Sequence, residues 1–202
     1  SICTNNSGTG NSSSFERRFN DAVSKGKTLE PNYYQRGDSI YVIVEGDTWE
    51  KAQENAKELG GNLATINDSQ EGEWLVNQLY GEGKASSKLS DQLALPGESL
   101  RGTSIWLGHA DLNNSGQYVS VSGDENIYSN WGPGELNDGI GKQEKYTMLT
   151  LFDNPNRDPG MVGTVDNRQY NTPQLVERGG AHIFYGLAEI KVNENMEIND
   201  NE

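Results

Sequence analysis

Oxygen-bearing side chains that suit a hard metal ion cluster in the second half of the chain, after the run Gly132-Pro133-Gly134. The set comprises Glu135, Asn137, Asp138, Glu144, Asp166 and Asn167. Ca²⁺ takes roughly six to eight oxygen ligands from carboxylates, amide carbonyls and water, and it accepts ligands from irregular backbone. These residue types, on a segment broken by glycine and proline, therefore predict a Ca²⁺ site. The rest of the chain is expected to act as its scaffold.

Aromatic residues near this stretch favour core packing over contact with a ligand. Trp131 lies just before the acidic loop, and we expect it to pack in the core beneath the loop. Tyr128, Tyr170 and Tyr185 are further candidates for stacking on a ligand. An aromatic ring can serve either purpose, because it carries a large apolar surface and, in tyrosine, a polar tip.

The sequence offers little chemistry for catalysis. His109 and His182 are the only histidines, and neither lies beside a serine or cysteine in a nucleophile motif. Glu135 and Glu144 are open to a second interpretation, as a carboxylate pair for glycoside hydrolysis. No glycine-rich phosphate loop is expected, because the glycines after Trp131 adjoin acidic residues that would repel phosphate.

Composition narrows the range of partners. The 202 residues carry a formal net charge of −14, which argues against nucleic acid because phosphate binding needs clustered lysine and arginine. The single cysteine, Cys3, allows no internal disulfide. No apolar run reaches the ~18 residues of a transmembrane helix, so we expect no membrane insertion. The missing initiator methionine leaves open whether the chain is a fragment.

Hydrophobic periodicity predicts the elements that position the acidic loop. A short helix is expected over residues 15–25, and two more begin at capping signals at Asp47 and Asp68. Strands are expected over residues 33–34, 39–44, 62–66, 104–108, 117–121, 146–151 and 183–190. Arg36-Gly37-Asp38 is expected at the turn between the first two strands. This order predicts an α+β fold with a small antiparallel sheet.

Long polar segments separate the later strands and set the expected boundaries. They are expected at residues 82–103, 111–116, 153–160 and 166–180. Long loops in compact domains are usually functional, and the candidate ligands lie in or beside these. We expect residues 1–32 to form a linker or attachment segment with a short helix, residues 33–192 to form the domain, and residues 193–202 to form a disordered acidic tail.

Four stretches together resemble the C-type lectin-like domain, over about residues 33–192. Trp49-Glu50-Lys51-Ala52 and the run from Leu59 to Ile66 are similar to the family's first helix and following strand. Ile105-Trp106-Leu107-Gly108 resembles its Trp-Ile-Gly-Leu core strand, and Gly134-Glu135-Leu136-Asn137 resembles its Glu-Pro-Asn loop. The resemblance implies the C-type lectin-like fold, with two helices, small antiparallel sheets and a long loop region.

The resemblance also implies the chemistry of the loop, because in this family a loop-bound Ca²⁺ coordinates vicinal hydroxyls of a sugar. It assigns Glu135, Asn137 and Glu144 to three ligand positions of the principal site. Asp166-Asn167 falls where the family has an Asn-Asp pair, so the order is reversed here, and Asp166 could also lend its backbone carbonyl. The implied sugar-binding residues are Glu135, Asn137, Glu144 and Asn167. Ligation therefore accounts for both glutamates, and we expect no enzymatic activity.

Three departures from the family pattern accompany this resemblance. An auxiliary Ca²⁺ site would use Asp111, Asp138 and Glu144, but Ser115 stands at its remaining carboxylate position. The family's disulfides are absent, with Ala56 and Tyr146 at cysteine positions, which is similar to bacterial or phage members of the fold. Leu136 replaces the loop proline. A non-proline cis bond costs about 2.5–4 kcal/mol, so we expect this peptide to be trans.

The sequence thus predicts a non-catalytic, Ca²⁺-dependent carbohydrate-binding module, a lectin or adhesin on an extracellular, cell or virion surface. Its expected partners are glycans on a cell surface, bound weakly at each site and usefully only through multivalency. The alternative is a structural module of lectin-like fold that assembles through protein–protein contacts without binding sugar. In that case residues 1–32 would attach it to a larger surface or virion assembly.

Overall fold

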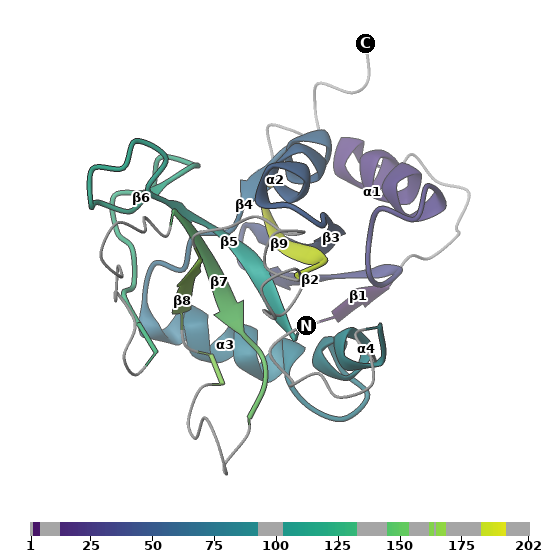
Figure 1. Cartoon of the computed structure of the whole chain (residues 1–202). Coiled ribbons are helices and arrows are strands. Elements are labelled where there is room, and N and C mark those ends of the chain that lie inside the picture. The colour runs from purple at the N-terminus through teal and green to yellow at the C-terminus, as the bar shows by residue number, and fades with distance from the viewer. Residues whose placement is uncertain are drawn as a thin grey trace.

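The computed structural model describes residues 2–4, 13–92, 103–132, 145–153, 162–163, 165–168 and 183–192, and for 2–4, 90–92 and 165–168 the backbone alone. The strands are β1 (Ile2–Thr4), β2 (Asn32–Arg36), β3 (Ser39–Glu45), β4 (Asn62–Leu63), β5 (Ser104–Ala110), β6 (Val119–Ser120), β7 (Tyr146–Thr150), β8 (Val165–Arg168) and β9 (Tyr185–Lys191). The helices are α1 (Ser14–Ser24), α2 (Trp49–Glu58), α3 (Ser69–Leu79) and α4 (Ala85–Gln92). Helices α1 and α2 lie on one side of the strands, and α3 and α4 lie on the other (Figure 1).

Strand β9 is the centre of the sheet, whose order is β1-β2-β3-β9-β5-β7-β8. It pairs antiparallel with β3 along its whole length, from Ser39 opposite Lys191 to Glu45 opposite Tyr185. It also pairs antiparallel with β4 and parallel with β5, while β6 pairs with β5. The predicted α+β architecture is therefore confirmed, and the sheet is mainly antiparallel with one parallel pair.

The core has two halves because buried strands alternate their side chains between the two faces of the sheet. Along β3, Val42 and Val44 join the cluster that contains Phe19 of α1 and Trp49 of α2. Tyr41 and Ile43 instead join the cluster with side chains of α3 and α4. In β5, Trp106 belongs to the first half, and Ile105 and Leu107 belong to the second. The period-two pattern of these strands thus builds both helix-covered faces.

The helices begin where polar caps satisfy free backbone N–H groups, as the sequence predicts. Asp68 caps α3 and accepts a hydrogen bond from the Glu71 N–H at 2.8 Å. For α2 the cap is Thr48, whose hydroxyl accepts from the Lys51 N–H at 3.1 Å. The prediction that Asp47 caps this helix is wrong by one residue, because a threonine hydroxyl serves the same purpose.

The first 32 residues contribute more to the domain than a linker would. The predicted short helix is confirmed as α1, and Phe15 and Phe19 of this helix contact the Tyr33 ring edge-on. Residues 2–4, expected in a flexible lead-in, form β1, with Cys3 opposite Tyr33 of β2. The apolar face of α1 is therefore engaged with the domain's own core.

Two further segments differ from the prediction. The polar segment 82–103 was expected to be a loop insertion, but it contains α4, whose Ala85 and Leu89 are buried one helical turn apart. Asp166-Asn167 was expected to open a loop, but it lies in β8, which pairs with β7. Strands β4 and β6 are shorter than expected. In the part of the chain that is described, no helix is both long and apolar enough to span a bilayer.

Candidate functional site

The long segment that follows β5 leaves and rejoins the sheet at neighbouring positions. Asp111 directly follows β5, and its backbone N–H donates a hydrogen bond to the Lys145 carbonyl oxygen at 2.9 Å. Lys145 directly precedes β7, whose first residue, Tyr146, pairs with both Ala110 and Arg168. The end of β5, the start of β7 and the end of β8 therefore meet at one edge. We call this edge, defined by Asp111, Lys145 and Arg168, the loop junction.

Asp111 is held rigidly at the loop junction. One carboxylate oxygen, Oδ1, accepts from the Ser115 N–H at 2.9 Å and the Ser115 hydroxyl at 3.2 Å. The other, Oδ2, accepts from the Gly116 N–H at 2.9 Å. Burial acts to raise the pKa of this carboxyl, but the three hydrogen bonds outweigh burial, and the pKa is lowered. The site therefore keeps a fixed negative charge where the segment leaves the sheet.

Asp166 and Asn167 reach the same region on β8. Asp166 lies opposite Met148 of β7, and Asn167 lies opposite Thr147. Successive residues of a strand occupy opposite faces of the sheet, so these two positions do not share a face. The prediction that Asp166-Asn167 opens a loop is therefore wrong, because pairing with β7 makes this segment a strand and places the two residues on opposite faces.

The segment before the acidic loop is anchored to the scaffold by specific contacts. Trp131 is half-buried against the core half that includes α3, and its ring meets Tyr118 edge-on at a centroid distance of 5.2 Å. The Asn130 side-chain amide donates to the Gly163 carbonyl oxygen at 3.1 Å. Trp131 therefore packs against the core, as predicted, while the loop above it lies outside the described residues.

Four predicted ligands, Glu135, Asn137, Asp138 and Glu144, lie outside the described residues, as do Leu136, Tyr170 and His182. Among the residues that are described, no group of three or more histidine, cysteine, aspartate or glutamate side chains is placed to hold a metal ion. The fit to Ca²⁺ therefore rests on donor chemistry. Carboxylates and amide oxygens are the donors that Ca²⁺ prefers, and Asp111 supplies one fixed carboxylate beside the loop.

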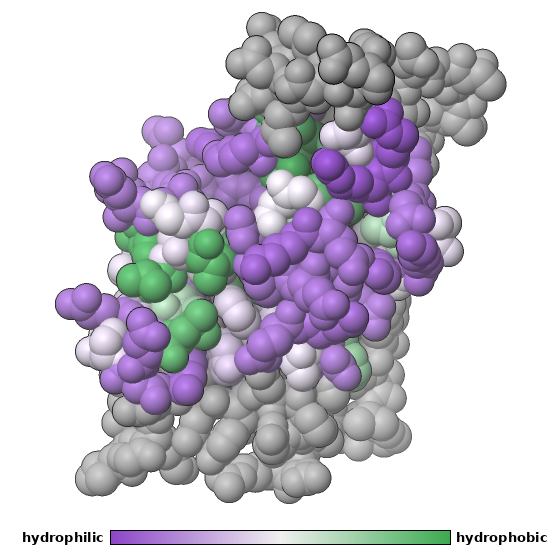
Figure 2. Space-filling model, turned by 90° about the horizontal axis from the view of Figure 1, so that it is seen from above, coloured by the Kyte–Doolittle hydropathy of each residue, from purple (hydrophilic) through white to green (hydrophobic). Residues whose placement is uncertain are grey.

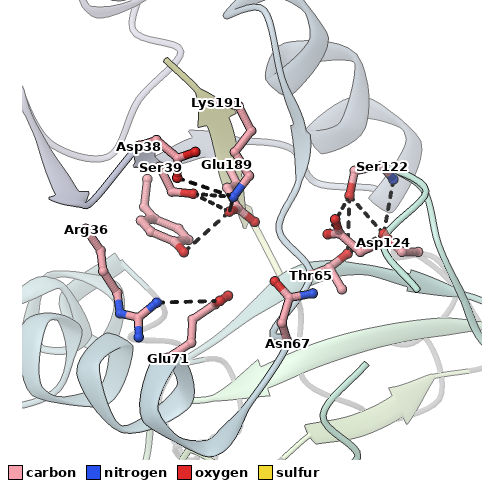
Figure 3. A network of polar contacts seen from close by, with 12 residues as sticks. Arg36, Asp38, Ser39, Thr65, Asn67, Glu71, Ser122, Asp124, Glu189 and Lys191 are labelled. Carbon is pink, nitrogen blue, oxygen red and sulfur yellow. Dashed lines mark hydrogen bonds and ion pairs between the residues drawn. The ribbon is translucent and has the colours of Figure 1, made fainter. Parts of the chain in front are cut away.

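A buried acidic network, which the sequence did not predict, joins β9 to β3 and α3 (Figure 3). Glu189 accepts hydrogen bonds from the Ser39 hydroxyl at 2.7 Å and the Tyr41 hydroxyl at 3.4 Å, and Lys191 lies 3.2 Å away. Glu71 of α3 is buried nearby. Its Oε2 lies 4.0 Å from Arg36 Nη1, and its Oε1 has no hydrogen-bond partner among the described residues. The only sequence signal was a glutamate within the apolar run of β9.

The position of Glu71 shifts its proton equilibrium. Burial is the largest cause and, together with the nearby Glu189 charge, raises the pKa of Glu71 from 4.5 to about 7, against the opposing effect of Arg36. His109 is shifted in the opposite sense, because burial lowers its pKa to about 4. Its Nε2 accepts from the Ile66 N–H at 3.1 Å, so His109 is a neutral core residue rather than a general base.

Comparisons with known proteins bear on the fold and the family. The Lectin C-type domain family matches residues 45–171. A perlucin-like protein of Mytilus galloprovincialis is 28% identical over 98 residues, covering 48% of this chain and 53% of that relative, so the match spans about half of the relative's length. The human scavenger receptor C-type lectin carbohydrate-recognition domain is similar in structure, with a TM-score of 0.54 at 18% identity, covering 81% of this chain and 98% of that one. The cow CD23 carbohydrate-recognition domain, determined in the presence of a GlcNAc2Man3 oligosaccharide, gives a TM-score of 0.51 at 20% identity, covering 80% and 94%.

Proposed function

The chain belongs to the C-type lectin domain family, and from this premise we propose that it is a Ca²⁺-dependent carbohydrate-binding module without catalytic activity. The loop junction is the observation that carries the proposal. The Asp111–Lys145 hydrogen bond closes the segment that contains the candidate ligands against one edge of the sheet. Because the two ends of the segment are already held together, the entropy of closing it is met by the fold and not by ligand binding.

The donor set divides between two ion sites in this proposal. The principal ion would be held by Glu135, Asn137, Glu144 and either Asp166 or Asn167. The auxiliary ion would be held by Asp111, Asp138 and Glu144. When bound, Ca²⁺ supplies open coordination positions for the vicinal hydroxyls of a sugar. The carboxylates of the principal site accept hydrogen bonds from the same hydroxyls, and Asn137 and Asn167 donate to them through their amides.

Affinity arguments favour action outside the cell or on its surface. Extracellular Ca²⁺ modules typically bind in the ~10⁻⁴ to 10⁻³ M range, which extracellular calcium saturates and cytosolic calcium does not. A single sugar buries little area, so adhesion to a cell-surface glycan needs several copies acting together. The cow CD23 domain, whose structure was determined with an oligosaccharide present, supports glycans as the ligand class.

A second candidate function, protein–protein assembly without sugar binding, is favoured by one observation. Leu112 and Val119, beside the loop junction, expose 48% and 56% of their surface. A view from above shows a mainly hydrophilic surface with several apolar areas, the most extended of them at the left (Figure 2). Attachment through residues 1–32 would have to use surfaces other than the apolar face of α1, because Phe15 and Phe19 are buried in the domain.

The test is a calorimetric titration of Ca²⁺ into the chelator-treated chain. We expect saturable binding that the Glu135→Ala plus Glu144→Ala variant loses. A Glu16→Ala plus Glu82→Ala variant, which removes the same charge at two exposed positions, should bind as the parent does. Absence of binding heat, together with a melting temperature indifferent to Ca²⁺, would exclude the metal-dependent mechanism.

A glycan array separates the two candidate functions. A sugar signal that disappears with chelator supports the Ca²⁺-dependent module. Absence of a sugar signal both with and without Ca²⁺, in a chain shown to bind the ion, would favour assembly through protein contacts. Leu112→Ser plus Val119→Ser should then lower self-association or partner binding, because the variant removes the exposed apolar surface.

A further inference from the structure

A cavity of about 400 Å³ lies between α3 and two segments that pack beside it, Tyr128–Asn130 and Val162-Gly163. This volume falls in the range of roughly 300–1,000 Å³ that small-molecule sites occupy. Among the described residues, neither Asp111 nor Lys145 of the loop junction lines it.

The helical wall of the cavity presents a row of unused polar groups. Ser69, Glu73 and Asn77 are spaced four residues apart, so they share one face of α3. All three line the cavity, and none of their side chains makes a hydrogen bond or ion pair within the described part of the chain. Val76, on the same wall, adds an apolar surface between them. The wall therefore offers a hydroxyl, a carboxylate and an amide without internal partners.

A second part of the lining is the aromatic ring of Tyr128, which packs against α3. Tyr128 is half-buried, and its backbone N–H donates to the Ile66 carbonyl oxygen at 2.7 Å. One edge of the ring lies over Gly72, where an added Cβ would meet the ring carbons at 3.8 Å. The Asn130 side chain ties this wall to Gly163. Because these contacts fix both sides, a ligand would find the cavity already formed.

We propose that this cavity binds a neutral pyranose directly, without a metal ion. A pyranose ring has an apolar face that packs on an aromatic side chain and a rim of hydroxyls that pair with amides, hydroxyls and carboxylates. Tyr128 supplies the first surface, and Ser69, Glu73 and Asn77 supply the second. Among the described lining residues there is no lysine or arginine, and the one charged side chain, Glu73, is negative, so we expect sialylated and sulfated sugars to be disfavoured.

This inference goes beyond the Ca²⁺-dependent site and does not depend on it. Two saccharide sites on one domain would allow a branched or extended glycan to engage both, and the second contact would then form at a raised effective concentration. Ca²⁺ removal should therefore weaken binding to such a glycan without abolishing contact at the α3 cavity.

The experiment is an amide chemical-shift titration of the ¹⁵N-labelled full chain in EDTA, with methyl β-glucopyranoside and methyl α-mannopyranoside as probes. We expect saturable shifts at the Gly72 and Gly163 amides and at the Asn77 side-chain amide with at least one of them. The methyl glycoside of N-acetylneuraminic acid should leave these signals unmoved. EDTA silences the proposed Ca²⁺ site, so the two proposals succeed or fail separately.

Variants then test the assignment of roles. Tyr128→Ala should weaken binding of the probe about tenfold or more, because the stacking surface is lost. Asn77→Ala, at an exposed position of α3, should weaken binding several-fold. Gln70→Ala, at another exposed position of the same helix outside the described lining, is the matched control and should have no effect. Absence of saturable shifts at these amides with both probes, or shifts that Tyr128→Ala and Asn77→Ala both retain, would overturn the proposal.

Discussion

Two acidic side chains in this domain are covered to a similar extent but differ in charge behaviour. Asp111 at the loop junction is 8% exposed, and Glu71 beneath β9 is 4% exposed. The pKa of Asp111 is lowered, whereas the pKa of Glu71 is raised to about 7. Both carboxyls feel burial, which favours the neutral form. The difference lies in the donors around them.

Asp111 is surrounded by hydrogen-bond donors that its own turn provides, while Glu71 has almost none. Three hydrogen bonds from Ser115 and Gly116 stabilise the ionised Asp111. Glu71 lies 4.0 Å from Arg36 and close to the second carboxylate, on Glu189. One of its own oxygens, Oε1, has no hydrogen-bond partner among the described residues. Burial alone therefore does not identify a reactive or metal-binding carboxylate. The local supply of N–H groups decides whether the group stays charged near neutral pH.

The largest effect is expected for Glu71→Gln. The folded chain holds the Glu71 proton more tightly than the unfolded chain does, so the free energy of unfolding should fall as pH rises from about 4.5 to about 7. The variant carries no ionisable group at this position, so its free energy of unfolding at pH 8 should exceed that of the parent by about 2 kcal/mol, with little difference at pH 4.5. Urea denaturation at both pH values measures it. Equal stability of the two proteins at pH 8 would contradict the comparison.

The opposite sign is expected for Asp111→Asn. The amide keeps an oxygen for Ser115, but its NH₂ group opposes the Gly116 N–H. The free energy of unfolding of the variant should therefore be lower than that of the parent by about 1–2 kcal/mol at pH 7. The contribution of Asp111 is present above its unfolded pKa and is lost only as pH falls through its lowered folded pKa. Denaturation at pH 7, with Asp153→Asn as a control at an exposed aspartate, tests this. A variant at least as stable as the parent would show that the turn does not depend on the carboxylate.

The smallest effect is expected for Arg36→Gln. Arg36 lowers the pKa of Glu71 from 4.0 Å away, so its removal should move that pKa above about 7. The side chain is 36% exposed, and the change in stability at pH 8 should stay below about 1 kcal/mol. A carboxyl ¹³C titration of Glu71 reports the shift directly. An unchanged or lowered pKa would mean that Arg36 does not act on this carboxyl.

The sequence predicted the elements that carry their own signal. Strands β3, β5 and β9 are runs of β-branched and apolar residues, and the capping signal of Asp68 and Glu71 marks the start of α3. These features are local, so they can be identified without tertiary information. The resemblance to the family then ordered them into the correct fold.

Elements that depend on a partner were missed. Strand β8 is a polar four-residue segment that is a strand because β7 lies beside it, and β1 likewise exists through β2. Helix α4 has only Ala85 and Leu89 as an apolar pair, too short a pattern to distinguish it from a polar loop. Such segments gain their structure from docking rather than from propensity.

The candidate site was predicted unevenly for the same reason. Asp111 was identified through the resemblance to the family, and the structure places it at the loop junction, directly after β5. Glu71 and Glu189 lie far apart in the sequence, and only the docking of α3 beneath β9 brings their charges together. The α3 cavity likewise could not be predicted, because its lining comes both from α3 and from later segments of the chain.

The central place of β9 has a consequence for synthesis in the cell. β9 follows every other described element in the chain, yet it pairs with β3, β4 and β5. A nascent chain that has not yet released residues 185–191 from the ribosome lacks the middle of its sheet and exposes the edges of β3 and β5. Contacts between such distant segments form slowly. The domain is therefore expected to fold only after its last strand emerges, and until then the unpaired edges of β3 and β5 are open to aggregation.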